Sequence, residues 1–410
     1  MSRRRWSCLV GLLLLLLLVA LGFPYAIRRL GGAFTHAPAE AEHGLSAGAR
    51  GLIERAFQGL DSERLLDYHT HLVGLGTSDS GAFVSPRMRS WWHLTKRLQF
   101  EVYLSASGVT DVEDADRQYV ARLSDQIRHI PGHGRYLLLA FDRNHDNPEQ
   151  TEFYVPNAYA FRVAEAHPDL FVPAMSVHPY RPDALTELEH WAKRGARIVK
   201  WLPNAMGIDP ASERCDAYYA KMKELDLALL THVGEEQAVD TEGAQELGNP
   251  LRLRRALDAG VKVILAHCAS LGQGEDLDAP GTRRDNFDLF LRLMDEPRHE
   301  GRLFGEISAL LQYNRIPRPL MTLLERKDLH PRLVNGSDYP LPAVNVVVRT
   351  RMLVKLGVIT ADERTHLNEI YDYNPLLFDF VSKRTLKHPE SGHGFAPSIF
   401  LAHPALAPAR

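Results

Sequence analysis

A strand–helix–strand unit occupies residues 196–234, which read ARIVKWLPNAMGIDPASERCDAYYAKMKELDLALLTHVG. Its two ends, residues 196–203 and 227–234, are nearly continuous apolar runs of strand length, a pattern typical of parallel strands covered on both faces. Each run holds a basic side chain near its carboxyl end, Lys200 in the first run and His232 in the second. The unit therefore predicts two parallel strands joined by a crossover helix.

The same alternation continues in both directions along the chain. Six further apolar runs of strand length are found at residues 65–72, 135–142, 170–178, 261–269, 302–309 and 332–339. The stretches between them carry helix end signals: Ser212 can cap the helix that follows it, and Asn249-Pro250 begins another that Gly260 closes. Eight alternating strand–helix units predict an α/β fold, the (β/α)8 TIM barrel.

The rest of the chain divides around this barrel. We assign the barrel to residues 49–387, with a Pro- and Ala-rich C-terminal tail at 388–410. Residues 73–115 are too long for a simple loop after the first strand, so we expect an insertion over the barrel mouth. Residues 31–48 are expected to be a tether that joins the barrel to an N-terminal segment at 1–30.

The N-terminal segment has the pattern of a membrane anchor. Arg3-Arg4-Arg5 precede an almost unbroken apolar run from Trp6 to Ile27, long enough to span the hydrocarbon core as a transmembrane helix. The positive-inside rule then predicts an extracytoplasmic catalytic domain, in the periplasm if the source is bacterial. Small residues at Ala20-Leu21-Gly22 leave the alternative that the run is a cleaved signal and the protein is secreted.

Charge and cysteine content exclude two classes of protein. The chain has 48 Lys and Arg against 51 Asp and Glu, a formal charge of −3, so no basic field exists for a nucleic-acid partner. Its three cysteines are scattered and one lies in the apolar leader, which excludes a disulfide framework and a cysteine-type zinc site.

Polar residues recur where the predicted strands end. The first strand ends in Asp-Tyr-His-Thr-His at residues 67–71, and alternation places His69 and His71 on one face. Later strands end with Lys200, His232, His267 and Asp338, which are 32, 35 and 71 residues apart, or one, one and two strand–helix units. Barrel enzymes keep their chemistry on that rim, and converging imidazole and carboxylate groups can bind Zn²⁺ or a similar divalent ion.

The ordered set of motifs resembles the amidohydrolase superfamily, and its amidohydrolase-related (type 2) branch in particular. The motifs are DYHTH at 67–71, IVKWLPNAMGIDP at 198–210, LLTHVGEE at 229–236, ILAHC at 264–268 and NGSDYP at 335–340. The sequence NPLLF at 374–378 resembles the closing helix of the branch. The resemblance covers residues about 60 to 380 and not the leader, the insertion or the tail.

The resemblance implies a metal centre with up to six ligands: His69, His71, Lys200, His232, His267 and Asp338. In binuclear members the lysine is carbamylated and bridges two ions. In mononuclear members the first histidine pair, one later histidine and the aspartate hold a single ion, and the other histidine acts in catalysis. One ion or two, and a carbamylated Lys200, therefore stay open; Zn²⁺ is the expected metal and Mn²⁺ the alternative.

The implied function is metal-dependent hydrolysis of an amide, ester or lactone in a small molecule, with metal-activated water attacking the carbonyl. Asp338 would accept the proton and return it to the leaving group, with His267 and Lys200 as further catalytic residues. The type 2 branch also holds decarboxylases and hydratases that act on small carboxylic acids, which gives a lyase as the first alternative. The second is a non-catalytic, membrane-tethered metal-binding domain.

Substrate contacts are the least determined part of the sequence. The candidate cations for a substrate carboxylate are Arg181, Arg143 and Arg315, each of which follows a predicted strand. Glu235 and Glu236 follow His232 directly and are candidates for ordering that ligand or contacting substrate. Glu306 lies inside an apolar strand, where a carboxylate needs a partner.

Overall fold

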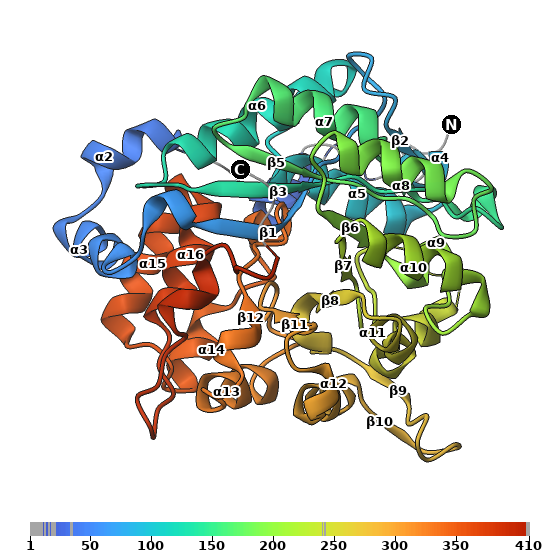
Figure 1. The fold of residues 1–410 in the computed structure, drawn as a ribbon. Coiled ribbons are helices and arrows are strands. Elements are labelled where there is room, and N and C mark those ends of the chain that lie inside the picture. The colour runs from blue at the N-terminus through green and yellow to red at the C-terminus, as the bar shows by residue number, and fades with distance from the viewer. Residues whose placement is uncertain are drawn as a thin grey trace, which may run out of the picture.

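The computed structural model describes residues 22–32, 36–239, 241 and 243–406, together with Gly11, Leu14 and Leu17. Eight strands in this part of the chain form the barrel: β1 (Leu66–His71), β3 (Arg135–Leu139), β5 (Phe171–Ala174), β6 (Ile198–Trp201), β7 (Ala228–Thr231), β8 (Lys262–Leu265), β11 (Leu303–Glu306) and β12 (Leu333–Val334). Each lies within one of the eight predicted apolar runs. The predicted α/β barrel is therefore confirmed (Figure 1).

The barrel closes through parallel pairing. Parallel ladders join β1, β3 and β5 on one side and β6, β7, β8, β11 and β12 on the other. Two isolated parallel bridges, Met175 with Val199 and Thr70 with Tyr339, join the two sheets into a ring. All carboxyl ends of the strands consequently meet at one end of the barrel.

Helices cover the outside of the ring (Figure 1). Those between the strands are α6 (Ala115–Arg128), α7 (Asn157–Ala166), α8 (Ala184–Lys193), α10 (Asp216–Glu224), α11 (Arg254–Asp258), α12 (Asn286–Asp295) and α13 (Arg318–Glu325). The predicted end signals hold: Ser212 accepts a hydrogen bond from the backbone N–H of Arg214, and Asn249 from that of Leu251. Local capping and the apolar pattern thus fix the helix starts where expected.

Helices from both ends of the chain complete the layer of helices around the strand ring. Beyond β12 come α14 (Thr350–Lys355), α15 (Ala361–Tyr373) and α16 (Pro375–Thr385), and α3 (Ala47–Phe57) packs against the last two. Asn374 caps α16 by accepting from the N–H groups of Leu376 and Leu377. The expected closing helix is therefore present, and the N-terminal α3 is part of the same layer.

The predicted insertion lies over the mouth of the barrel. It contains β2 (Phe83–Val84), α4 (Pro86–Arg89) and α5 (Leu94–Ala106), and β2 pairs with β4 (Phe153–Tyr154) from the loop after β3. Phe100 and Leu104 of α5 line the cavity above the strand ends. The insertion thus supplies a wall of the candidate site.

Two terminal regions differ from expectation. Residues 36–46 of the predicted tether pack on α15: His36 stacks on Tyr373 at 4.5 Å between ring centroids, and the Ser46 hydroxyl donates to Glu369 at 2.7 Å. The C-terminal tail is part of the barrel, because Leu401 bridges to Leu65 and Leu406 is buried. Both segments bury apolar side chains that a free linker would leave in water.

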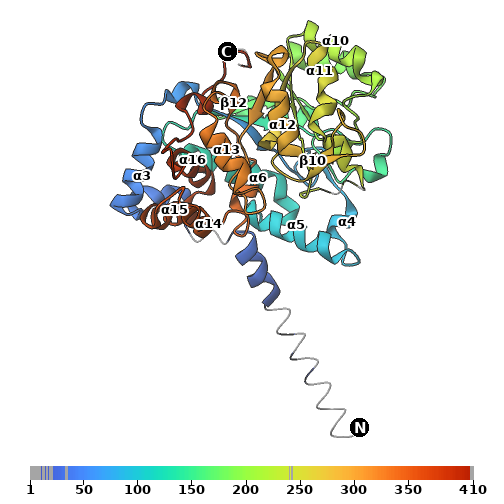
Figure 2. The same cartoon turned by 90° about the horizontal axis from the view of Figure 1, so that it is seen from below.

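The predicted membrane anchor falls largely outside the described residues. Residues 22–30 are helical and project from the side of the molecule where α5 lies (Figure 2). Within the part of the chain that the structure describes, no helix is both long enough and apolar enough to cross a membrane. Most of the Trp6–Ile27 run is not among those residues, so the anchor remains a prediction.

Candidate metal centre

The two histidines of the first strand reach the site through an irregularity in β1. Leu66 and Tyr68 pack in the barrel interior, so strict alternation would turn His69 away from it. The pairing with β3 shifts by one residue between Asp67 and Thr70, as in a β-bulge. Beyond the shift, His69 and His71 lie towards the interior, where both line the cavity.

Three other predicted residues lie at or just beyond the carboxyl ends of their strands. Lys200 lies two residues after interior Ile198, His232 two after Leu230, and Asp338 four after Val334. All three side chains are buried and line the same cavity. For Lys200 and His232 the period-two rule of a strand explains the position, whereas Asp338 lies in the turn after β12.

His267 enters the site through a turn and not through a strand. The sequence placed it inside the sixth strand, but β8 ends at Leu265 and His267 has a positive φ of 56°. Asp338 also has a positive φ of 60°. Left-handed backbone is unfavourable for residues with a Cβ and is concentrated at functional sites, so this strain marks both residues as functional candidates.

The predicted ligands converge. Lys200 Nζ lies 3.1 Å from His69 Nε2, and Asp338 Oδ1 lies 3.0 Å from His71 Nε2 and 3.5 Å from His69 Nε2. His267 Nε2 lies 4.0 Å from the other oxygen of Asp338. The His232 and His267 rings are 5.2 Å apart. The six predicted residues therefore lie near one another at the carboxyl ends of the strands, and His69, His71 and Asp338 offer ligand atoms within 4.8 Å of one another.

Two polar side chains hold the ligands from behind. Glu306 Oε2 lies 2.9 Å from His69 Nδ1, and Ser308 Oγ lies 2.8 Å from His267 Nδ1. Ser308 also donates to Glu306 at 2.7 Å. These contacts leave the Nε2 atoms of both histidines facing the centre, as buried partners of metal ligands commonly do. The sequence signalled Glu306 as a buried carboxylate in need of a partner, but it gave no signal for Ser308.

Burial sets the protonation states. Desolvation, helped by the positive charge of Lys200, holds the pKa of His69 and that of His232 well below the ordinary value. Desolvation does the same for the pKa of His267, followed by the charge of Arg315. Burial also lowers the pKa of Lys200 to about 8, although Asp338 and Glu306 oppose that shift. The imidazoles are therefore neutral near pH 7, the state in which they bind metals.

The residues present fit a divalent ion. His232 Nε2 is buried without a hydrogen-bond partner, although an unsatisfied polar atom in the interior is costly. His69, His71 and Asp338 offer ligand atoms that lie within 4.8 Å of one another, and so do His69, His267 and Glu306. A cation held by His69, His71 and Asp338 would offset the carboxylate charge, and the unpaired nitrogen of His232 is available to a cation in the same cavity.

The candidate substrate residues separate into two groups. Glu236 lines the cavity, and its carboxylate lies 3.3 Å from His232 Nδ1, so it can orient that ring. Glu235 is not among the lining residues and accepts from Gln237 at 2.9 Å. Arg181 does not line the cavity either, because its guanidinium is held by Asp183 and Asp142. The expectation that Arg181 binds substrate is therefore corrected.

Of the other two arginines, Arg315 reaches the site. It is buried, lines the cavity and donates to Ser270 at 3.0 Å. No described carboxylate forms an ion pair with it, although burial lowers its pKa and Asp338 opposes that shift. Arg143 instead lies over the Tyr154 ring at 4.1 Å and is outside the cavity. Arg315 is thus the arginine that can meet an anionic substrate group.

Proteins of known structure resemble the chain over about three quarters of its length. The solved structures that the chain resembles include an uncharacterised TIM-barrel protein from Bordetella bronchiseptica (17% identity, 74% of this chain and 94% of that chain, TM-score 0.41), 5-carboxyvanillate decarboxylase from Sphingomonas paucimobilis (11%, 79% and 97%, 0.40) and 4-oxalomesaconate hydratase from Rhodopseudomonas palustris (14%, 75% and 95%, 0.40). No curated protein matches the chain. A family model described as amidohydrolase matches residues 66–349, which cover the whole barrel from β1 to the end of the site. The chain therefore belongs to the amidohydrolase family, in its second branch.

Proposed function

We propose that the protein is a metal-dependent hydrolase acting on an amide, ester or lactone carbonyl in a small molecule. The observation that carries this proposal is the convergence of Asp338, His69 and His71 in a cavity. A divalent ion, Zn²⁺ or the alternative Mn²⁺, would supply Lewis acidity towards the carbonyl and activate water for attack. His69, His71, His232, His267 and Asp338 are the residues that would hold one or two such ions.

Asp338 is the proposed proton carrier. Its two oxygens face different histidines, Oδ1 towards His71 at 3.0 Å and Oδ2 towards His267 at 4.0 Å. A carboxylate in that position can accept a proton from the attacking water and return it to the leaving group. His267, fixed by Ser308 through Nδ1, can share this proton transfer in a centre with a single ion.

Lys200 has two proposed roles. As a neutral amine it can add CO₂ and release a proton, and the resulting carbamate would be an anionic bridge between two ions. As an ammonium ion it would instead repel a second metal and orient an anionic substrate group. Its Nζ lies 3.1 Å from His69 Nε2, close enough to the proposed metal ligands to act in either role.

Metal content and turnover test the proposal together. Purified full-length protein should contain one or two equivalents of a divalent ion and hydrolyse members of a panel of amides, esters and lactones. A chelator should remove activity, and the ion should restore it. Protein that never binds metal would refute the proposal; protein that binds metal without turnover would favour the non-catalytic alternative.

A lyase is the second candidate function, favoured by Arg315. A buried arginine in the cavity without an ion-pair partner among the described residues can hold the carboxylate of a small acid. Decarboxylation or hydration would then replace hydrolysis at the same centre. Release of CO₂ from candidate acids, or addition of water across a double bond without bond cleavage, would distinguish the lyase from the hydrolase.

The cellular location is also proposed from the sequence. We propose that residues 1–30 anchor the protein in a membrane with the barrel on the extracytoplasmic side, or are removed as a signal to give a secreted enzyme. A reporter fused after Arg410 should then behave as extracytoplasmic, and the mature N-terminus would decide between anchor and signal. A cytoplasmic reporter would refute the location.

A further inference from the structure

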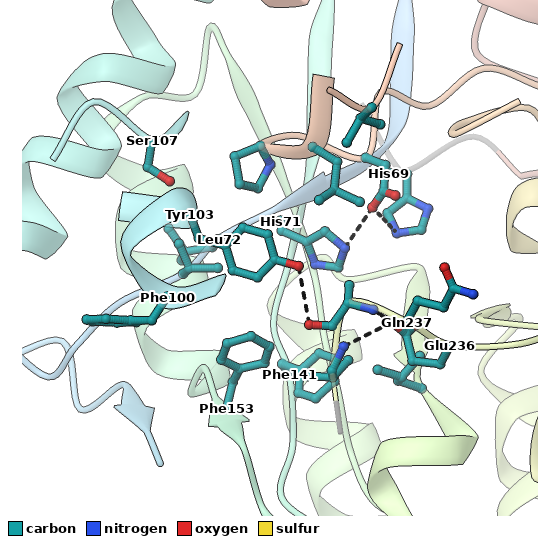
Figure 3. A pocket seen from close by; sticks show the side chains of 18 of the residues that line it. His69, His71, Leu72, Phe100, Tyr103, Ser107, Phe141, Phe153, Glu236 and Gln237 are labelled. Atoms are coloured by element: carbon teal, nitrogen blue, oxygen red, sulfur yellow. Dashed lines mark hydrogen bonds and ion pairs between the residues drawn. The ribbon is translucent and has the colours of Figure 1, made fainter. Parts of the chain in front are cut away.

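The cavity above the metal centre has a second, apolar half. Its volume is about 340 Å³, and the wall away from the ligands is formed by Leu75, Val84, Phe100, Leu104, Val109 and Phe153. Figure 3 shows Phe100, Tyr103 and Phe153 on one side of the pocket, and His69 and Glu236 on the other. The insertion after β1 and the loop after β3 supply this wall. A ligand that fills the cavity therefore meets polar chemistry at one end and apolar surface at the other.

Three polar side chains of the apolar half are already engaged by the protein. The Tyr103 hydroxyl donates to the carbonyl oxygen of Ala238 at 3.3 Å, and that of Tyr119 donates to the carbonyl oxygen of His71. Asp116 accepts from the backbone N–H groups of Leu75 and Gly76. The remaining charged residues among the described lining are Lys200, Glu236, Arg315 and Asp338, all at the polar end. The wall consequently offers a ligand hydrophobic contact and few hydrogen bonds.

The opening of the cavity lies beside the carboxyl end of the N-terminal segment, residues 1–30. The exposed lining residues Gln237, Tyr313 and Val346 mark where the cavity meets solvent. Asn345, next to Val346, donates to the carbonyl oxygens of Arg29 and Leu30 at 2.7 and 2.8 Å. The carboxyl end of the helix of residues 22–30 thus lies beside the rim of the opening, and the helix projects away from the barrel (Figure 2).

From these observations we propose that the cavity takes an amphiphilic substrate, an acyl compound whose apolar chain lies against the insertion wall while its carbonyl group reaches the histidine cluster. This inference rests on the proposed function for the reaction, but the binding of the chain does not depend on it. Burial of each methylene contributes about 0.8 kcal/mol at most, so affinity should rise by about two- to fourfold per added carbon.

Binding of a homologous series tests the proposal. Saturated carboxylic acids of six, eight and ten carbons are titrated calorimetrically into metal-free full-length protein held in lipid nanodiscs. Leu104→Glu places a charge on the apolar wall and should weaken decanoate binding at least tenfold. Leu98→Glu is the matched control, because Leu98 is 41% exposed on the same helix and does not line the cavity. Partition of the acids into the lipid is common to both variants and cancels in their comparison.

The outcomes separate the two proposals. A two- to fourfold gain per carbon that Leu104→Glu removes and Leu98→Glu keeps within twofold supports the amphiphile site, even if the enzyme proves to be no hydrolase. Affinity independent of chain length, or equal losses in the two variants, overturns it. Hydrolysis of short and long acyl esters at equal kcat/KM would also overturn it while leaving the proposed hydrolase intact.

Discussion

The two ends of this barrel differ in the polarity of the side chains that they bury. At the carboxyl ends of the strands, His69, Lys200 and Glu306 are buried within hydrogen-bond distance of one another or of a shared partner. At the amino ends, Leu66 and Tyr68 pack with apolar residues of the other strands, and Leu406 from the C-terminal segment joins them. One end concentrates groups that are costly to bury, and the other end consists of groups that gain from burial.

This difference indicates a division of labour within one fold. Apolar packing at the amino ends stabilises the ring without any chemistry, so it can offset the strain and desolvation at the carboxyl ends. His267 and Asp338, both with left-handed backbone, belong to the costly end. Substitutions at the carboxyl ends of the strands should therefore alter function more than stability. Substitutions at the amino ends should alter stability more than function.

The largest effect is expected from Asp338→Asn. The amide keeps the shape of the carboxylate but cannot carry the proton, so kcat should fall by about 10²–10⁴-fold while Tm stays near that of the natural protein. Steady-state kinetics and thermal unfolding on the same preparation give both numbers. A variant that unfolds would contradict the expectation that residues at the carboxyl ends of the strands serve function more than stability.

Lys200→Ala should distinguish the two forms of the centre. If Lys200 is a bridging carbamate, metal content should fall towards one equivalent, activity should fall by orders of magnitude, and short carboxylic acids should restore part of it. If Lys200 is an ammonium, the single metal stays and substrate affinity is lost without rescue. Metal analysis with and without bicarbonate is the measurement; metal content that ignores both mutation and bicarbonate excludes the bridge.

Glu306→Gln tests the support behind the ligands. The carboxylate holds His69 through Nδ1, and loss of such a partner typically weakens metal affinity by about 10–100-fold. Competition with a chromogenic chelator measures that affinity, with exposed Glu300→Gln as the control. Unchanged affinity would show that the position of His69 does not depend on Glu306.

Gly336→Ala, at the carboxyl ends of the strands, is expected to reduce both stability and metal binding. A Cβ at residue 336 would stand 2.5 Å from Glu306 Oε1 and 2.6 Å from the Cβ of His69, so both must shift. We expect about 1–3 kcal/mol of lost stability together with weaker metal binding. Denaturant unfolding and the chelator assay measure the two effects. Gly51→Ala in α3, where the nearest atom is 3.5 Å from the added Cβ, should leave metal binding unchanged and raise stability by about 0.5–1 kcal/mol.

The smallest effect on activity is expected from Leu406→Ala. Leu406 is 3% exposed at the amino ends of the strands, and its truncation should cost about 2 kcal/mol of unfolding free energy. Metal content and kcat/KM of the folded protein should not change. A loss of metal that matches the loss of stability would show that the two ends are coupled.

Much of the site could be predicted from the sequence because strands repeat every two residues. Lys200 and His232 follow the alternation of interior residues in their own strands, and the spacing of one or more strand–helix units brings them and Asp338 to one rim. Apolar run length and helix caps located all eight strands. These features are local, so the amino-acid order alone determined them.

Other features depended on contacts between distant segments. The histidines of β1 face the centre only because the pairing with β3 shifts, and His267 only because the chain turns left-handed after β8. Ser308 contributes to the site because its hydroxyl contacts His267 Nδ1. Arg181 does not reach the cavity because Asp142 and Asp183 bind its guanidinium. Pairing register, backbone strain and the choice among ion-pair partners are set by the free energy of the whole packed barrel, which no single stretch of sequence contains.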